Sequence, residues 1–121
     1  MADCRFEKKF RLLSARDFSN LKVGSQSFKK PTAIIYYKKN SLNLTRIGLS
    51  VPKKIGNSVM RNRYKRLVRE LFRLSSAKYL GYDILFVVSW SRAVAPYSEV
   101  EKQNLLLTHV SEFLRFLEQR N

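Results

Sequence analysis

The chain has 121 residues, and its 24 Lys and Arg against 9 Asp and Glu give a formal net charge of +15. This length fits one hydrophobic core, so we expect a single domain over residues 1–121. So large a positive charge opposes compaction unless an anionic partner offsets it. Composition therefore favours nucleic acid as the first candidate partner and an anionic membrane surface as the second.

Cysteine and histidine content restricts the compartment and the cofactors. The single cysteine, Cys4, can form no internal disulfide, and one cysteine with one histidine supplies too few ligands for an ordinary zinc site. The longest apolar run, residues 84–88, is too short to span a membrane, and no signal peptide is evident. We therefore predict a soluble, cytoplasmic protein that binds no metal or other cofactor itself.

The first half of the chain predicts an arm, one helix and two strands. Residues 1–12 are basic with isolated apolar positions and are expected to form the arm. Ser14 can cap a short helix over residues 15–23, which Gly24 ends. After a polar turn at residues 24–27, β-branched and aromatic side chains predict a strand over residues 32–37. Alternating polar and apolar residues predict another over residues 45–51, and we expect the two strands to form an antiparallel pair.

The second half predicts two helices with a strand between them. Pro52 ends the preceding strand, and Asn57 or Ser58 can cap a long helix that extends to about residue 74. Residues 81–90 have the continuous apolar character of a central strand buried on both faces. Ser98 and Glu101 form a capping box, which predicts the start of the last helix.

The long helix is two-sided on a helical wheel, with Met60, Tyr64, Leu67, Val68, Leu71 and Phe72 on its apolar side. The opposite side carries Asn62, Lys65, Arg66, Arg69 and Arg73. A run of charge is usually a solvated face, but here only Glu70 is acidic and the basic residues share one stripe. Lys53 and Lys54 precede the helix, and Asn57 and the amide groups of its first turn can receive phosphate oxygens. We therefore predict that this helix lies along a phosphate backbone, with Arg61 and Arg63 directed to separate phosphates or strands.

No part of the sequence predicts catalysis by the protein. His109, the only histidine, lies beside the core-facing Val110 with no predicted nucleophile or second ligand, so we interpret it as structural. Asp83, beside the buried strand, is expected to pair with a basic residue. No phosphate-binding glycine loop or cluster of metal ligands occurs. We therefore predict no catalytic residue and no metal ligand.

Residues 61–63 read Arg-Asn-Arg, within a longer motif that resembles the signature of the protein subunit of bacterial ribonuclease P. The motif comprises Arg46-Ile47-Gly48-Leu49-Ser50-Val51, Lys53-Lys54-Ile55-Gly56-Asn57, Val59, Arg61-Asn62-Arg63 and Lys65-Arg66. The resemblance implies an α+β fold, a small α/β sandwich with three helices and a mixed sheet of about three to four strands. It also implies a left-handed strand-helix-strand crossover around the basic helix, an exception to the usual handedness.

The resemblance further implies an accessory subunit of an endoribonuclease whose catalyst is RNA. The RNA subunit and its magnesium ions would remove the 5′ leader of precursor tRNA, and the protein would bind that RNA and the leader, with no membrane and no obligate protein partner. The positions that inherit RNA binding from the motif region, together with Arg73 on the same face, are Lys53, Lys54, Asn57, Arg61, Asn62, Arg63, Lys65, Arg66, Arg69 and Arg73.

Three further positions, Arg11, Phe18 and Tyr36, match the leader-binding cleft of the family. Phe18 and Tyr36 could stack on unpaired bases, although a role as core aromatics fits their sequence context nearly as well. Lys22 stands where the family often has a second aromatic residue, which predicts a cleft that depends less on stacking and more on charge.

Three alternatives to this hypothesis have different consequences. A general RNA-binding or RNA-chaperone module would bind unrelated structured RNAs equally well. A protein-only nuclease would need a carboxylate cluster that the sequence does not show. Membrane attachment is disfavoured because so small a domain needs the apolar side of the basic helix for its core.

Overall fold

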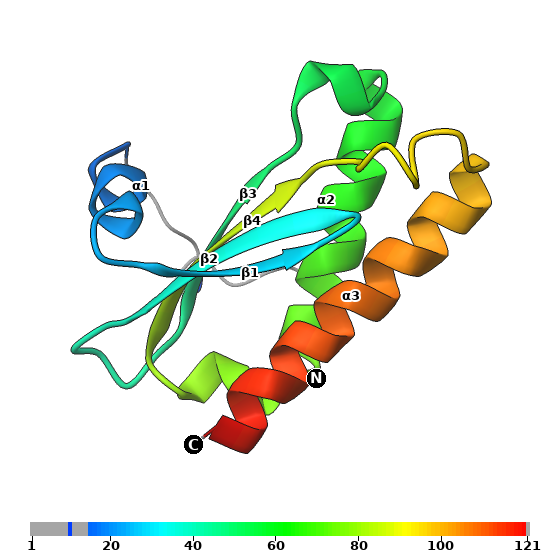
Figure 1. Cartoon of the computed structure of the whole chain (residues 1–121). Helices are drawn as coiled ribbons and strands as arrows, with labels where there is room; N and C mark the ends of the chain where they lie inside the picture. The colour runs from blue at the N-terminus through cyan, green and yellow to red at the C-terminus, as the bar shows by residue number, and fades with distance from the viewer. Residues whose placement is uncertain (1–9, 11–14, 121) are drawn as a thin grey trace.

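The computed structural model describes Phe10 and residues 15–120, which form a mixed sheet with helices on both of its faces (Figure 1). The elements in chain order are α1 (Ala15–Lys22), β1 (Gln26–Lys30), β2 (Ala33–Lys39), β3 (Arg46–Ser50), the 3-10 turn η2 (Lys53–Ile55), α2 (Ser58–Arg73), the 3-10 turn η3 (Ser76–Tyr79), β4 (Tyr82–Val88) and α3 (Glu99–Arg120). Helices α2 and α3 lie on one face of the sheet, and the short α1 lies on the other (Figure 1). This arrangement confirms the predicted α+β class with three α-helices.

The strand order in the sheet is β1-β2-β4-β3. Strand β2 pairs antiparallel with both β1 and β4, and β3 pairs parallel with β4. The predicted antiparallel pair of β2 and β3 is therefore wrong, because β4 lies between them. A strand as apolar as β4 is stabilised by neighbours on both of its edges, and it reaches β3 in parallel only through the crossover that contains α2.

Strand β1 is missing from the sequence-based prediction, which assigned residues 24–27 to a polar turn. Its five residues are mostly exposed, and Phe28 is the one large apolar side chain among them. Phe28 pairs with Ile35 of β2 and packs against Phe113 and Phe116 of α3. An edge strand with only one partly buried apolar side chain has no alternating pattern to detect, so its pairing with β2 defines it.

Strands β3 and β4 are parallel, and the connection between them contains α2, the basic helix, which lies on the same face of the sheet as α3 (Figure 1). Helix α2 begins at Ser58 after the η2 turn and ends at Arg73, close to its predicted bounds. The Asn57 side chain accepts a hydrogen bond of 2.9 Å from the backbone N–H of Met60, which confirms Asn57 as the cap. The left-handedness of the crossover stays a prediction from the family resemblance.

The main core lies between the sheet and the pair α2 and α3. Ala33, Ile35 and Tyr37 alternate along β2 toward this face, as the two-residue period of a strand requires. The predicted apolar side of α2 supplies three fully buried residues, Tyr64, Val68 and Phe72. A smaller cluster on the α1 face contains Leu21 and Leu85, with Phe18, Tyr36 and Val87 packed against it.

The two helices of the main layer are joined by a buried hydroxyl. The Tyr64 hydroxyl of α2 donates a hydrogen bond of 2.5 Å to the Glu99 carboxylate at the start of α3. Burial raises the pKa of Tyr64, and the bond to Glu99 raises it further, so the hydroxyl remains a neutral donor. Ser98 and Glu101 exchange the two hydrogen bonds of the predicted capping box. The start of α3, and with it the position of α2, is thereby fixed.

Candidate nucleic-acid interface

The polar side of α2 faces away from the core, as the helical wheel predicts. Of the predicted RNA-binding residues on η2, its following turn and α2, six are exposed: Lys53, Lys54, Asn57, Asn62, Arg63 and Arg66. Four are half-buried: Arg61, Lys65, Arg69 and Arg73. All ten are therefore at least partly accessible, and in sequence they extend from η2 before α2 to the last residue of the helix.

Arg61 has a structural role that the sequence does not indicate. Its Nε donates a hydrogen bond of 3.1 Å to the carbonyl oxygen of Gly56, at the turn between η2 and α2. This bond holds the turn against the first helical turn and leaves the two terminal nitrogens of the guanidinium for other partners. Arg61 can therefore hold the turn before α2 in place and bind an anion at the same time.

Arg73, at the other end of α2, pairs with the single acidic residue of the stripe. Its Nη2 and Nε donate to the two carboxylate oxygens of Glu70 at 2.6 and 3.2 Å, the two-pronged geometry typical of arginine and carboxylate. This contact lowers the pKa of Glu70, which therefore stays ionised. The ion pair offsets part of the positive charge at this end, so the excess lies toward the N-terminal end of α2.

The predicted leader-binding residues fall partly within the described structure. Arg11 lies outside the described residues, and Lys22 is the last residue of α1, where only its backbone is described. Phe18 and Tyr36 are both half-buried and pack against the same small cluster around Leu21 and Leu85. The structure thus brings these two aromatic residues together on the α1 face, with part of each side chain accessible.

An ion-pair network that sequence analysis did not assign to the site connects α1 to the sheet. Arg46 of β3 makes hydrogen bonds of 3.0 and 2.8 Å to the two oxygens of Asp83 on β4, and its Nη1 lies 3.7 Å from Asp17 of α1. The hydrogen bond to Asp83 raises the pKa of Arg46. The predicted pairing of Asp83 with a basic residue is confirmed. Arg46 opens the family motif, which was the available sequence signal for its importance.

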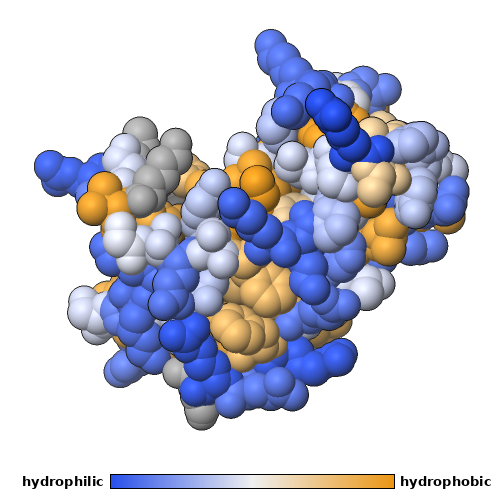
Figure 2. Space-filling model, in the orientation of Figure 1, coloured by the Kyte–Doolittle hydropathy of each residue, from blue (hydrophilic) through white to orange (hydrophobic). Residues whose placement is uncertain are grey.

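A pocket of about 570 Å³, the α1-side pocket, opens beside this network. It is lined by Asn20, Leu21, Val23, Lys38, Lys39, Asn40, Ser41, Leu42, Arg46 and Asp83. Figure 2 shows hydrophilic side chains over much of this view of the molecule. Basic and amide side chains at a concave surface next to partly exposed aromatics suit single-stranded nucleic acid.

Among the residues that the structure describes, no group of three or more His, Cys, Asp or Glu side chains could hold a metal ion. His109 of α3 is hydrogen-bonded through Nδ1 to the hydroxyl of the fully buried Thr32 at 2.7 Å. This contact agrees with the structural interpretation of His109. Within the same described part of the chain, no helix is long and apolar enough to cross a membrane.

Comparison with known proteins assigns the family. The family profile described as Ribonuclease P matches residues 6–111. The ribonuclease P protein component of Alkaliphilus oremlandii is 40% identical over 98 residues, which are 80% of this chain and 86% of that protein. The corresponding protein of Natranaerobius thermophilus is 37% identical over 91 residues, 74% of this chain and 79% of its own length.

Solved structures agree with the sequence comparison. The ribonuclease P protein of Staphylococcus aureus superposes with a TM-score of 0.70 at 28% identity, covering 86% of this chain and 94% of that one. The protein from Thermotoga maritima gives a TM-score of 0.65 at 27% identity, covering 84% and 96% of the two chains. With a matching profile, matching relatives and a matching fold, the chain belongs to the family of bacterial ribonuclease P protein components.

Proposed function

We propose that this chain is the RNA-binding, noncatalytic subunit of a ribonuclease P ribonucleoprotein that removes the 5′ leader of precursor tRNA. Family membership supports a role in an endoribonuclease complex with an RNA subunit. The observation that carries the division of labour is the basic stripe of α2, exposed along one side while the opposite side is buried in the core. A helix of this kind offers positive charge and hydrogen-bond donors to a polyanion.

The ten residues of the stripe and its approach would hold the RNA subunit. The exposed Lys53, Lys54 and Arg63 lie around the N-terminal end of α2, where backbone N–H groups and the positive end of the helix dipole also favour phosphate. Arg66 has no ion pair or side-chain hydrogen bond with any described residue. Its guanidinium can therefore reach a phosphate without breaking an existing contact.

The α1 face would hold the leader of precursor tRNA. Phe18 and Tyr36 are half-buried and pack against the cluster of Leu21, which lines the α1-side pocket, and Lys38 and Lys39 supply positive charge to that pocket. Unpaired bases stack on such rings while the backbone contacts the basic groups, an arrangement that tolerates any sequence. Arg11 and Lys22 belong to the same proposed cleft by their positions in the family motif.

Catalysis would reside in the RNA subunit, with magnesium ions held by RNA. On the protein side, the support is the structural contact of His109, the only histidine in the sequence, with the buried Thr32. The proposed partners are the catalytic RNA and precursor tRNA, with no membrane and no obligate protein partner. The proposed compartment is the cytoplasm, as expected for a lone cysteine and a tRNA-processing role.

Reconstitution tests this function. The full chain, the candidate RNA subunit and a precursor tRNA with a labelled 5′ end are combined at moderate magnesium concentration, and leader release is measured. We expect release only when protein and RNA are both present, and none from the protein alone. Cleavage by the protein with RNA contamination excluded would contradict a noncatalytic role. Equal affinity for unrelated structured RNAs would instead support a general RNA chaperone.

A further inference from the structure

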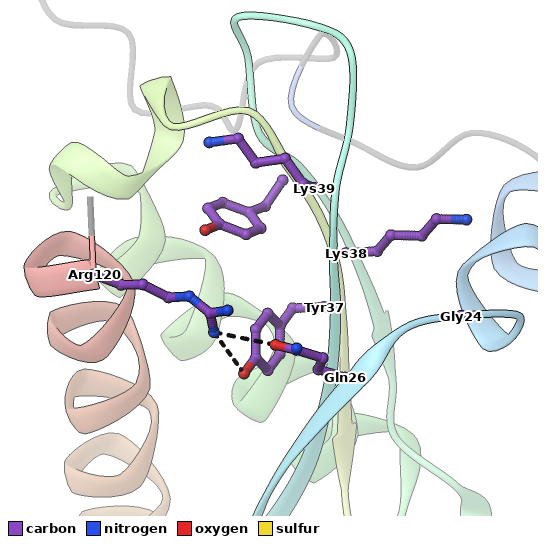
Figure 3. A pocket seen from close by; sticks show the side chains of 7 residues that line it. Gly24, Gln26, Tyr37, Lys38, Lys39 and Arg120 are labelled. Carbon is purple, nitrogen blue, oxygen red and sulfur yellow. Dashed lines mark hydrogen bonds between the residues drawn. The ribbon is translucent and has the colours of Figure 1, made fainter.

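A second pocket lies on the opposite side of strand β2, where the C-terminal end of α3 meets β1 and β4 (Figure 3). This α3-side pocket has a volume of about 370 Å³ and is lined by Gly24, Gln26, Tyr37, Lys38, Lys39, Tyr82 and Arg120. Its size is in the range of pockets that bind small ligands or parts of larger ones.

Arg120 is held in place at the edge of this pocket. Its Nη1 donates to the Gln26 side-chain oxygen at 3.1 Å and to the Tyr37 hydroxyl at 3.3 Å. The guanidinium also lies 5.8 Å from the ring centre of Tyr37 and 5.7 Å from that of Phe116. A long side chain that is already ordered loses less conformational entropy when a ligand binds.

The polar groups of Arg120, Gln26 and Tyr37 that are not used in these contacts are mainly hydrogen-bond donors. Arg120 keeps Nε and Nη2, and Gln26 keeps its amide nitrogen, since only its oxygen contacts Arg120. The Tyr37 hydroxyl accepts from Arg120 and therefore still has its own proton to donate. Figure 3 shows the Gln26, Tyr37 and Arg120 side chains converging, with their polar ends together. Such a set suits a ligand group that only accepts hydrogen bonds.

The charge of the α3-side pocket also favours an anionic ligand. The pocket is lined by three cationic side chains, Lys38, Lys39 and Arg120, and none of the described residues that line it is acidic. Within the described part of the chain, neither Lys38 nor Arg120 forms an ion pair. Lys38 is anchored by a hydrogen bond of 3.2 Å to the carbonyl oxygen of Val23, and Lys39 by one of 3.2 Å to that of Leu80.

Lys38 and Lys39 also connect this pocket to the α1-side pocket. Both residues line both pockets, although the sheet separates the faces on which the pockets open. Neighbouring residues of a strand point to opposite faces, so this pair at the end of β2 places one ammonium group toward each side. A nucleic-acid backbone that leaves the α1 face can therefore follow positive charge around the end of β2.

We propose that the α3-side pocket binds a phosphate group of single-stranded RNA whose preceding nucleotides lie in the α1-side pocket. Arg120, Gln26 and Tyr37 donate hydrogen bonds to the phosphate oxygens, and Lys38 and Lys39 neutralise the backbone on the way. The proposal rests on the proposed function, because the RNA concerned is the leader. It extends the leader path from the α1 face to the C-terminal end of α3.

Binding of oligouridines of increasing length to the full chain tests the proposal, with Arg120→Gln compared with Arg115→Gln. Arg115 is an exposed residue of the same helix that lines neither pocket, so both variants lose one positive charge. We expect Arg120→Gln to weaken binding of the longest oligouridine about threefold to tenfold more than Arg115→Gln. The salt dependence of its affinity should also fall by about 0.7, the value for one phosphate of a single strand. Equal affinities of the two variants would overturn the proposal.

A second variant keeps the test valid if loss of the Arg120 packing disturbs α3. Gln26→Glu leaves Arg120 an acceptor and keeps the size of the side chain, but places a negative charge in the pocket. We expect it to weaken binding of the longest oligouridine at least as much as Arg120→Gln does. Gln103→Glu, which adds the same charge elsewhere on α3, is the control. No difference between these two variants would also overturn the proposal.

Two further measurements separate this proposal from its alternatives. The Arg120 Nε–H resonance is followed by NMR during titration with inorganic phosphate and with the longest oligouridine. If phosphate shifts this resonance at concentrations as low as those at which the oligouridine does, the pocket is a site for free anions and the RNA assignment is overturned. Leader release by the assembled complex is measured in parallel with the wild-type chain. If release occurs while Arg120→Gln and Arg115→Gln bind RNA equally, the pocket proposal fails and the proposed function stands.

Discussion

Thr45 connects three backbone segments through one buried hydroxyl. The side chain is fully buried, donates to the carbonyl oxygen of Ala77 at 2.6 Å, and accepts from the backbone N–H groups of Gly81 and Tyr82 at 3.1 Å each. Gly81 itself has φ of +81°, and a Cβ there would lie 2.4 Å from the carbonyl oxygen of Leu42. The start of β4, which forms the Asp83 side of the ion-pair network, is fixed by these contacts.

Replacing Thr45 by valine should reduce the free energy of unfolding by about 2 to 4 kcal/mol, because two backbone donors and one acceptor lose a buried partner while the volume is unchanged. Urea denaturation followed by circular dichroism measures the change. Thr108→Val is the matched control, since its exposed hydroxyl donates only to the Asn104 carbonyl oxygen of its own helix. The control should differ from wild type by less than about 0.5 kcal/mol. Similar losses for both variants would contradict the role assigned to Thr45.

His109 makes stability depend on pH. Burial lowers its pKa below 6.5, the nearby Glu112 raises it, and Lys30 lowers it. The unfolded chain therefore takes up a proton at a higher pH than the folded chain does. The free energy of unfolding therefore falls as pH decreases from about 7 through the folded pKa of His109. Above about pH 7 the imidazole is neutral in both the folded and the unfolded chain, so its titration does not affect stability there.

His109→Gln should therefore become more stable relative to wild type as pH is lowered from about 8 to about 5, whatever the offset at pH 8. Glu112 lies in an ion pair of 2.8 Å with Lys30, which lowers its pKa, so Glu112 remains ionised over this interval. Thermal unfolding of both proteins at several pH values measures the difference. A stability difference that stays constant over this range would contradict the lowered pKa of the half-buried His109.

Helix α2 is the element whose buried and exposed sides the sequence predicts best. A helical period separates its apolar and basic sides without any knowledge of the fold, and the Asn57 cap is confirmed by a direct contact. The bond from Arg61 to Gly56 and the pairing of Arg73 with Glu70 depend on side-chain geometry, which a helical wheel does not contain. The wheel therefore identifies the surface, whereas the structure distinguishes its available cations from its paired ones.

Arg66→Gln should weaken binding to the RNA subunit and reduce the slope of log affinity against log salt by about one, if Arg66 neutralises one phosphate. The side chain is exposed and forms no ion pair or side-chain hydrogen bond with any described residue, so folding should be unchanged. Filter binding over a range of NaCl concentrations measures the slope. Arg115→Gln on α3 serves as the control for loss of one charge. An unchanged slope would remove Arg66 from the contact surface.

At the scale of the whole molecule, the order of strands was beyond the sequence-based prediction. The apolar pattern of residues 81–90 correctly indicates a central strand, yet its partners β2 and β3 are decided by long-range packing and by the crossover through α2. Strand β1 has only Phe28 to mark it, and the α3-side pocket joins residues as distant as Gln26 and Arg120. Local periodicity contains no information on pairs of residues so far apart in the sequence, so the α3-side pocket could not be predicted without the structure.

The net charge of +15 should make the stability of the whole chain depend on salt even without RNA. Like charges distributed over a small protein repel one another, and salt screens the repulsion as the Debye length falls from about 20 Å to about 7 Å. We expect the melting temperature to rise by about 3–6 °C between about 20 mM and 200 mM NaCl, which corresponds to about 1 kcal/mol in a chain of this length. Differential scanning calorimetry with NaCl and KCl measures the rise, which should be equal for the two salts and level off at higher concentration. A melting temperature that is constant over this range would show that the basic surfaces are already compensated within the free protein.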